Sequence, residues 1–230
     1  MMTLATSLTA LMVFAAAVAA GGGGTFHRPY GRADADFMYN LIFCDDPQLF
    51  VGKDKPTGAV ATVLSPAASV TELRRIADDE RVESRVRVLA FNRLRAAKGP
   101  VPKGTLLGVI IEMPLEKGLD VLAAFTDGTM RYINQTGKMV IIESPTPAMA
   151  AKREPLLKAA RVAIGRIGPS NKARLPPPRQ GNVRLTFLVS DGLYFGEGPV
   201  SAIARDDIGG PILAAGGDLL AVVVDASLKK

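Results

Sequence analysis

The residues best suited to chemistry are acids that follow apolar runs. Asp45 and Asp46 come shortly after the run 38–43, and Asp191 follows the run 183–189. Acids at strand ends gather at one edge of a sheet, and carboxylate oxygens are the ligands that Mg²⁺ prefers. Further acids that could join such a group are Glu112, Asp120 and Glu197. The pattern allows a Mg²⁺-dependent hydrolase, although Asp is also a common turn and capping residue.

Histidine and cysteine chemistry is restricted in this sequence. The chain has one His and one Cys, which excludes an intrachain disulfide and zinc sites of the Cys₂His₂ or Cys₄ type. His27 lies in an N-terminal segment that we expect to be outside the fold, so we expect no Ser-His-Asp or Cys-His catalysis. Cys44 ends an apolar run, where a small packing residue is more common than a nucleophile.

Two other segments carry groups that could hold a ligand. The Gly-rich run 190–199 precedes an expected helix, but it matches neither a P-loop nor a dinucleotide-binding fingerprint. We therefore interpret it as a structural loop and expect no cofactor. Residues 131–138 are dense in hydrogen-bonding side chains. The binding candidates there are Arg131, Tyr132, Asn134 and Lys138.

The positive charge of the chain is concentrated in one segment. The net charge is +6, and residues 152–182 alone hold eight bases and one acid. An amphipathic helix expected within this segment directs Lys158, Arg161 and Arg166 away from its apolar face. Such a face could bind an acidic protein or another polyanion through the 152–179 segment. The segment has no aromatic residue, so stacking on nucleic-acid bases is not expected.

Four strand-like runs at 105–113, 119–126, 129–134 and 138–143 are joined by short connections. Loops this short join only antiparallel neighbours. Asp127-Gly128 is typical of a two-residue hairpin turn, which would place Phe125 opposite Met130 and Ala123 opposite Tyr132. We therefore predict an α+β fold with an antiparallel β-meander and flanking helices, and the meander argues against the alternative of a parallel α/β sheet.

Other segments complete this fold. We predict strands over 38–43 and 183–189, with Asp191-Gly192 turning the second one back, while 59–64 is ambiguous between strand and helix. Ser69 and Glu72 have capping-box spacing, which predicts a short helix to about Asp78. Further expected helices cover 81–98, 147–167 and 212–228. Because proline is tolerated only in the first turn of a helix, Pro155 predicts that the regular part of the helix over 147–167 begins at about Glu154.

The first 37 residues are expected to stand apart from the fold, which then occupies 38–230 as one domain. Possible sub-units 38–168 and 183–230 are joined by the Pro-rich linker 169–182. Residues 8–20 form an apolar run of thirteen residues, which is short of the ~20 needed to span a bilayer. It resembles the core of a signal peptide but lacks a preceding base. The protein is exported through residues 1–20, or it is cytoplasmic with translation starting at Met38.

The balance of these patterns favours a non-catalytic binding or interaction protein. Apolar content is 48% and charged content is 22%, as in ordinary globular domains. Asp218 and Asp225 argue against a membrane span in the last helix, and we expect no transmembrane segment. The Mg²⁺-dependent hydrolase is the alternative, and it requires Asp45, Asp46 and Asp191 to converge in space.

Overall fold

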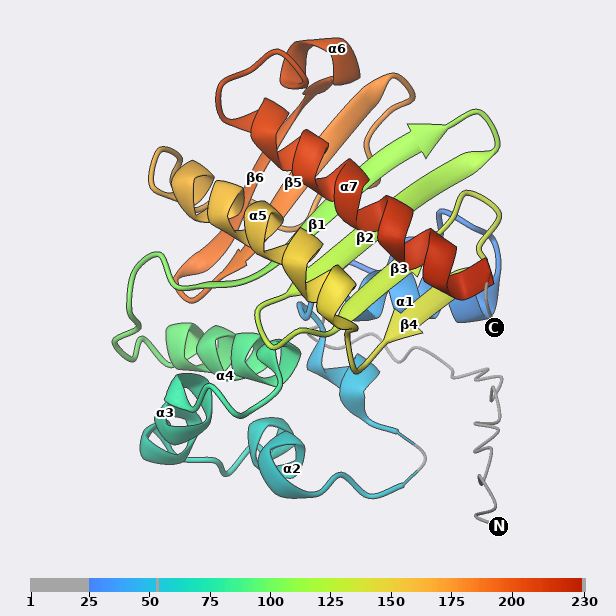
Figure 1. The fold of residues 1–230 in the computed structure, drawn as a ribbon. Helices are drawn as coiled ribbons and strands as arrows, with labels where there is room; N and C mark the ends of the chain where they lie inside the picture. Colours follow the sequence, from blue (N-terminus) through green and yellow to red (C-terminus); the bar gives the residue numbers. More distant parts are fainter. Residues whose placement is uncertain (1–24, 53, 229–230) are drawn as a thin grey trace.

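The computed structural model describes residues 25–52 and 54–228, and its centre is one sheet of antiparallel strands (Figure 1). The strands are β1 Leu106–Leu115, β2 Gly118–Phe125, β3 Met130–Ile133, β4 Met139–Ile142, β5 Asn182–Val189 and β6 Gly192–Pro199. Their order is β4-β3-β2-β1-β5-β6. The predicted α+β fold with an antiparallel meander is confirmed, since β1 to β4 are consecutive hairpins. The β5–β6 hairpin returns to pair with β1, so residues on both sides of the linker 169–182 share one sheet.

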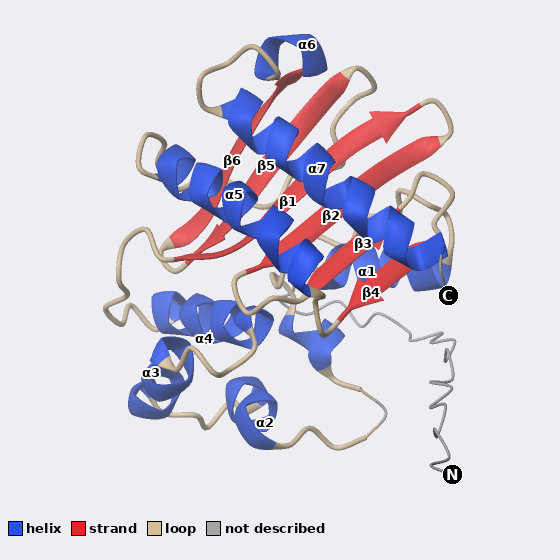
Figure 2. Ribbon diagram, in the orientation of Figure 1, coloured by secondary structure: helices blue, strands red, loops and turns tan. Residues whose placement is uncertain are grey.

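Helices cover both faces of this sheet (Figure 2). One face is packed by α5 Pro147–Ile164 and α7 Gly209–Leu228, which lie side by side. The other face is packed by α1 Ala33–Leu41 and α4 Ser84–Ala96, and α4 is in turn covered by α2 Gly58–Leu64 and α3 Val70–Asp78. The short helices are η1 Pro47–Phe50 and α6 Val200–Ile203. Neighbouring residues on a strand contribute to different cores, as Leu122 and Ala123 on β2 do, because successive side chains point to opposite faces of a sheet.

The prediction of a strand over 38–43 is wrong, because α1 extends through Met38 and ends at Leu41. Ala35 and Tyr39 are fully buried and lie four residues apart, which is the spacing of one helix face. Asp34 and Asp36 lie in the first turn, where the helix dipole favours acids. An apolar run of six residues does not by itself distinguish a strand from a helix end.

Residues 25–37 therefore belong to the fold, and the expected boundary at 37/38 is wrong for them. Tyr30 donates from its hydroxyl to the Leu119 carbonyl, and Asp36 is 1% exposed. His27, which was expected to lie outside the fold, belongs to it. Its backbone N–H donates to Asn40 Oδ1, and its carbonyl accepts from the Asn40 amide. The apolar run 8–20 and the proposed export segment 1–20 lie outside the described residues.

The β2–β3 hairpin differs by one residue from the expected register. Ala124 lies opposite Met130 and Leu122 opposite Tyr132. The loop has three residues, because Thr126 does not pair with β3 and instead donates its N–H to the Leu107 carbonyl on β1 at 3.0 Å. Three-residue hairpins with a left-handed residue in the last loop position are a common alternative to the two-residue turn. A register shift of one residue places each β3 side chain on the opposite face of the sheet relative to the β2 residues beside it.

Gly128 has φ +104°, and a β-carbon there would lie 2.7 Å from Arg153 Nη1. We expect Gly128→Val to lower the free energy of unfolding by about 1–3 kcal/mol, because a β-branched residue is strained in this backbone conformation. Thermal denaturation measures the effect. Gly168→Val is the matched control, since Gly168 is exposed and no atom lies within 4 Å of its β-carbon position. Equal melting temperatures for the two variants would contradict the turn geometry.

Helix α5 and strand β6 also differ from expectation. The helix begins at Pro147 with Thr146 as its N-cap, so Pro155 lies inside it and does not mark its start. The Gly-rich run 190–199, expected as a loop, is largely strand β6. The capping box of Ser69 and Glu72 at the start of α3 is confirmed, and the ambiguous run 59–64 is helical.

Helix α7 is the one helix among residues 25–52 and 54–228 that is long and apolar enough to cross a membrane. It lies across the sheet, and its buried residues include Ile212, Leu219 and Val223. Gly216 faces Ile111 on β1 so closely that a β-carbon would clash with it. The helix is thus a layer of the fold, tied to α5 by an ion pair between Lys152 and Asp218.

Candidate functional site

A cavity of about 360 Å³ opens between α4, the segment 170–174 and the β5–β6 turn. Its apolar wall consists of Phe43, Val88, Leu188, Val189 and Leu193, together with Ala173 and Gly192. Its polar lining consists of Asp45, Asn92, Arg95, Ser170, Lys172, Arg174 and Asp191. The cavity therefore combines apolar surface with charged groups of both signs, as small-molecule sites commonly do.

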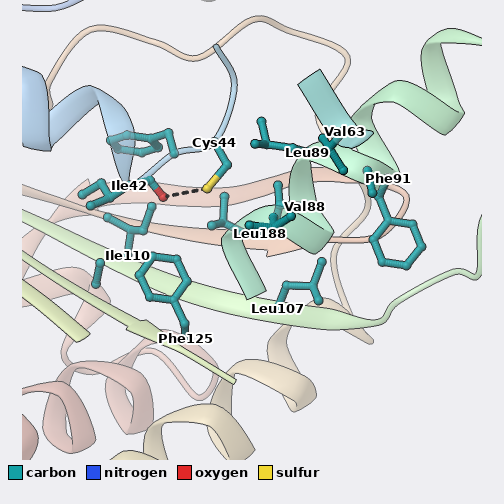
Figure 3. Packing of buried hydrophobic residues seen from close by; sticks show 14 of the residues in the cluster. Ile42, Cys44, Val63, Val88, Leu89, Phe91, Leu107, Ile110, Phe125 and Leu188 are labelled. Carbon is teal, nitrogen blue, oxygen red and sulfur yellow. Dashed lines mark hydrogen bonds between the residues drawn. The ribbon is translucent and has the colours of Figure 1, made fainter. Parts of the chain in front are cut away.

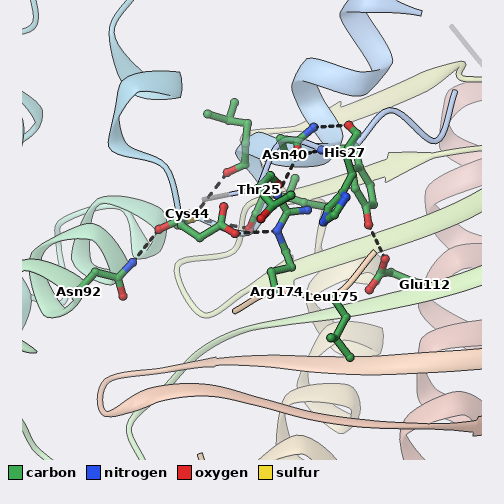
Figure 4. Close-up of polar contacts among 12 residues, drawn as sticks. Thr25, His27, Asn40, Cys44, Asn92, Glu112, Arg174 and Leu175 are labelled. Atoms are coloured by element: carbon green, nitrogen blue, oxygen red, sulfur yellow. Dashed lines mark hydrogen bonds and ion pairs between the residues drawn. The ribbon is translucent and has the colours of Figure 1, made fainter. Parts of the chain in front are cut away.

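Arg174 fixes the segment 170–174 against the rest of the domain (Figure 4). Its Nε donates to Asp45 Oδ2 at 2.6 Å, and its Nη2 donates to the Thr25 carbonyl at 2.8 Å and to Asn40 Oδ1 at 2.7 Å. The guanidinium also lies over the Phe43 ring, 4.4 Å from its centroid. The side chain is 4% exposed. A planar guanidinium can bond several acceptors in fixed directions at once, which is why Arg and not Lys suits this position.

Two buried atoms of this ion pair have no hydrogen-bond partner. They are Arg174 Nη1 and Asp45 Oδ1, and both residues line the cavity. Buried polar groups in proteins are nearly always bonded, and an unpaired one lowers stability. The ion pair therefore retains one unpaired donor atom and one unpaired acceptor atom in two residues that line the cavity.

The opposite side of the cavity is organised by Arg95 on α4. Its Nη1 donates to the Ser190 carbonyl at 2.7 Å, and its Nη2 donates to Asn92 Oδ1 at 2.6 Å. The Asn92 amide donates in turn to the Cys44 carbonyl at 2.7 Å. Burial lowers the pKa of Arg95, while the charge of Asp191 opposes that effect. Arg95 is thus a charged group whose hydrogen bonds go to neutral oxygens.

Cys44 is a packing residue, as its sequence setting indicated (Figure 3). It is fully buried, and its Sγ contacts the Ile42 carbonyl at 3.6 Å. Burial raises the pKa of the thiol far above its ordinary value. A thiol that stays protonated is a poor nucleophile.

A second polar cluster lies on the sheet and links three strands. Arg184 on β5 stands opposite Glu112 on β1 and Glu197 on β6. Its Nη2 donates to Glu197 at 2.6 Å, and its Nη1 lies 3.6 Å from Glu112 Oε2. Tyr39 donates to the other oxygen of Glu112 at 2.7 Å. Burial raises the pKa of Glu112, and the carboxyl is enclosed at 0% exposure. This cluster ties α1 to the sheet.

Two of the three candidate catalytic acids meet at the cavity. Asp45 and Asp191 both line it, but Asp191 accepts from Tyr194 Oη and from the Gly104 N–H, and Asp45 is paired with Arg174. Asp46 instead caps η1 by accepting from the Gln48 N–H at 2.9 Å. Glu112 and Glu197 bind Arg184, as above, and Asp120 accepts from Tyr132 and Gln135. Within 25–52 and 54–228, no three His, Cys, Asp or Glu side chains are grouped to hold a metal ion.

No family model, no curated protein and no solved structure matches this chain. The site is therefore interpreted from its own geometry alone.

The binding candidates on the hairpin are mostly engaged within the fold. Arg131 is 3% exposed and pairs with Glu143 at 2.5 Å. Tyr132 donates to Asp120 at 2.8 Å, and Asn134 Oδ1 accepts from the N–H groups of Thr136 and Lys138 in the turn. Of the four candidates, Lys138 alone is exposed.

The candidates on α5 are at the surface. Lys158, Arg161 and Arg166 are exposed, and Arg161 pairs with Glu154 at 3.0 Å. Arg174 was counted with these bases as part of the segment that could bind a polyanion. That prediction is wrong for Arg174, because the residue is buried.

Sequence reasoning missed Arg174, Arg95 and Asn92 as components of one site. The partners of Arg174 lie 129 to 149 residues away in the chain. No local pattern carries information over that distance. The place of His27 inside the fold was also missed. Burial, with a further contribution from the charge of Arg174, lowers the pKa of its imidazole. The imidazole is therefore neutral at pH 7.

Proposed function

We propose that this chain is a non-catalytic binding protein and that the cavity beside Arg174 holds its ligand. The observation that carries the proposal is the composition of the cavity: about 360 Å³ of space with an apolar wall and a charged rim. Sites for small organic molecules have volumes of about 300–1,000 Å³ and the same mixture of apolar wall and few polar groups.

The chemistry of the lining residues supports binding over catalysis. Asp45 is held in an ion pair, and Cys44 behind the wall is buried and protonated. A general base must be free to accept a proton at the reacting atom. The alternative of a Mg²⁺-dependent hydrolase needs several oxygen ligands around one ion, and Asp45 and Asp191 are joined by no third acid in the described part of the chain.

Binding in the cavity is tested by screening a fragment library with ¹H–¹⁵N NMR spectra of the ¹⁵N-labelled protein. We expect ligands to shift the amide signals of residues 92–95, 170–174 and 191–193. Leu193→Trp should weaken binding by about tenfold or more, equivalent to 1.4 kcal/mol, because Leu193 lines the cavity and is only partly buried. Leu213→Trp is the matched control, since Leu213 is partly buried against the opposite core.

Two outcomes would contradict the proposal. One is a library without any ligand that shifts these amide signals. The other is equal binding by the Leu193→Trp and Leu213→Trp variants, which would place the ligand elsewhere. The wild-type chain has no Trp, so fluorescence of the single Trp in each variant also shows that the substituted region remains folded.

Binding of a polyanion to the basic helix remains a separate proposal. Lys158, Arg166, Lys172 and Arg179 are exposed, and none forms an ion pair within the described residues. Arg174 does not contribute, since it is buried in the fold.

We expect the triple variant Lys158→Gln, Arg161→Gln, Arg166→Gln to leave a heparin column at lower salt than the wild type. The salt dependence of DNA binding should also become flatter, by about 0.9 in log–log slope for each phosphate that is no longer neutralised. The control is Arg75→Gln, Lys103→Gln, Lys117→Gln, which removes the same charge from exposed positions elsewhere. Equal elution of the two triple variants would show that net charge, not this surface, governs retention.

A further inference from the structure

The charges around the cavity do not cancel. Arg174 is neutralised by Asp45 at 2.6 Å, and Arg95 lies in the field of Asp191. Lys172 also lines the cavity, is exposed, and forms no ion pair among the described residues. The lining therefore has three bases and two acids, an excess of one positive charge.

The free hydrogen-bonding groups of the lining are mainly donors. Arg95 uses two of its five N–H groups, in bonds to Ser190 and Asn92. Arg174 Nη1 and the acceptor Asp45 Oδ1 are buried without a partner, and Lys172 has three N–H donors. A ligand that matches this lining presents acceptor oxygens with one negative charge, because hydrogen bonds between ionised groups are about twice as strong as neutral ones.

The remaining wall of the cavity is apolar. Phe43, Val88 and Leu188 are buried in the core, and Leu193 is partly buried beside them. Contact with this wall is favourable for a hydrocarbon or aromatic group, at about 25 cal/mol per Å² of apolar surface removed from water.

We propose that the ligand is a small organic monocarboxylate with an apolar body, bound with its carboxylate toward Lys172 and Arg95 and its body against Phe43 and Leu193. This inference rests on the proposed function, because it names the ligand class of the same cavity. A zwitterion or a cation would leave the excess positive charge without a partner.

Four related probes test the inference: phenylacetate, its neutral amide phenylacetamide, the amine 2-phenylethylamine and the zwitterion phenylalanine. NMR titrations at pH 7 and low salt give the dissociation constant of each. We expect phenylacetate to bind about tenfold or more tightly than phenylacetamide. Lys172→Gln should reduce that ratio toward one, because the variant removes the excess positive charge that only phenylacetate matches; Lys172 is exposed, so its loss does not disturb the core. Arg179→Gln, an exposed base in the same segment, should leave the ratio as it is.

Each remaining outcome overturns one of the two proposals. Binding of phenylacetamide, the amine or phenylalanine at least as tightly as phenylacetate would overturn the monocarboxylate inference and retain the cavity as a binding site. An unchanged ratio in the Lys172→Gln variant would also overturn it. Absence of binding by all four probes, together with a fragment screen that yields no ligand, would overturn the proposed function as well.

Discussion

A chain that begins at Met38 is expected to be unfolded under conditions in which a chain beginning at Thr25 is folded. The shorter chain lacks residues 33–37, the first half of α1. It also lacks the buried side chains of Ala35 and Asp36. Without Tyr30, no hydroxyl donates to the Leu119 carbonyl, so this segment no longer ties α1 to β2.

The size of the effect follows from the number of interactions removed. Domains have a free energy of unfolding of about 5–15 kcal/mol. Each buried polar group left without its partner costs about 1–3 kcal/mol. Removal of 25–37 takes away the acceptors of the Asn40 amide, which are the carbonyls of His27 and Asp36, and one acceptor of Arg174, which is the Thr25 carbonyl. Together with the lost burial of Ala35 and Asp36, these costs are comparable to the free energy of unfolding of an ordinary domain.

Circular dichroism and the dispersion of NMR amide signals distinguish the two chains directly. The chain beginning at Thr25 is the control, because it differs from the shorter one only by residues 25–37. A cooperative unfolding transition at the same temperature in both chains would contradict the prediction. It would support instead the interpretation that translation starts at Met38.

The parts of the fold that could be predicted are those governed by local patterns. The four strands of the meander are mostly apolar runs of 4 to 10 residues joined by short turns. The Ser69–Glu72 capping box acts within one helical turn. The predicted register of the β2–β3 hairpin is wrong because Thr126 donates its N–H to the Leu107 carbonyl on β1, and this bond selects the three-residue loop. That competition between neighbours is not visible in the turn residues themselves.

The candidate site could be predicted only in fragments. Asp45 and Asp191 were singled out in the sequence as candidate catalytic acids, and in the structure Asp45 is held in an ion pair and Asp191 in a turn. Arg174 was counted among the bases of the segment 152–179, which the sequence assigned to binding of a polyanion. Its burial depends on Asn40 and on Thr25, and Thr25 lies in the segment that was expected to be outside the fold. The wrong boundary therefore concealed one of the three residues that bond Arg174.

Arg174→Ala is expected to lower the free energy of unfolding by about 3–5 kcal/mol, as removal of one member of a buried ion pair does. The change removes the partner of Asp45 and a donor to Asn40 and Thr25. It also removes the guanidinium from the Phe43 ring, where it closes one side of the cavity. Asp45 is 27% exposed, so water compensates part of its unpaired charge and the lower end of the range is expected. Chemical denaturation measures the difference.

The matched control is Arg179→Ala in the same segment, which should change the free energy of unfolding by less than about 0.5 kcal/mol because Arg179 is exposed. Arg174→Lys should fall between the two, since one ammonium cannot reproduce the fixed directions of the guanidinium bonds. Combining Arg174→Ala with Asp45→Asn tests the pair itself: the double variant should be more stable than the sum of the two single effects predicts, because neither partner is then left as an unpaired charge. Strict additivity, or an Arg174→Ala variant as stable as Arg179→Ala, would mean that the ion pair does not hold residues 170–174 in place. The cavity would then depend on the apolar contacts of Phe43 and Leu193 alone.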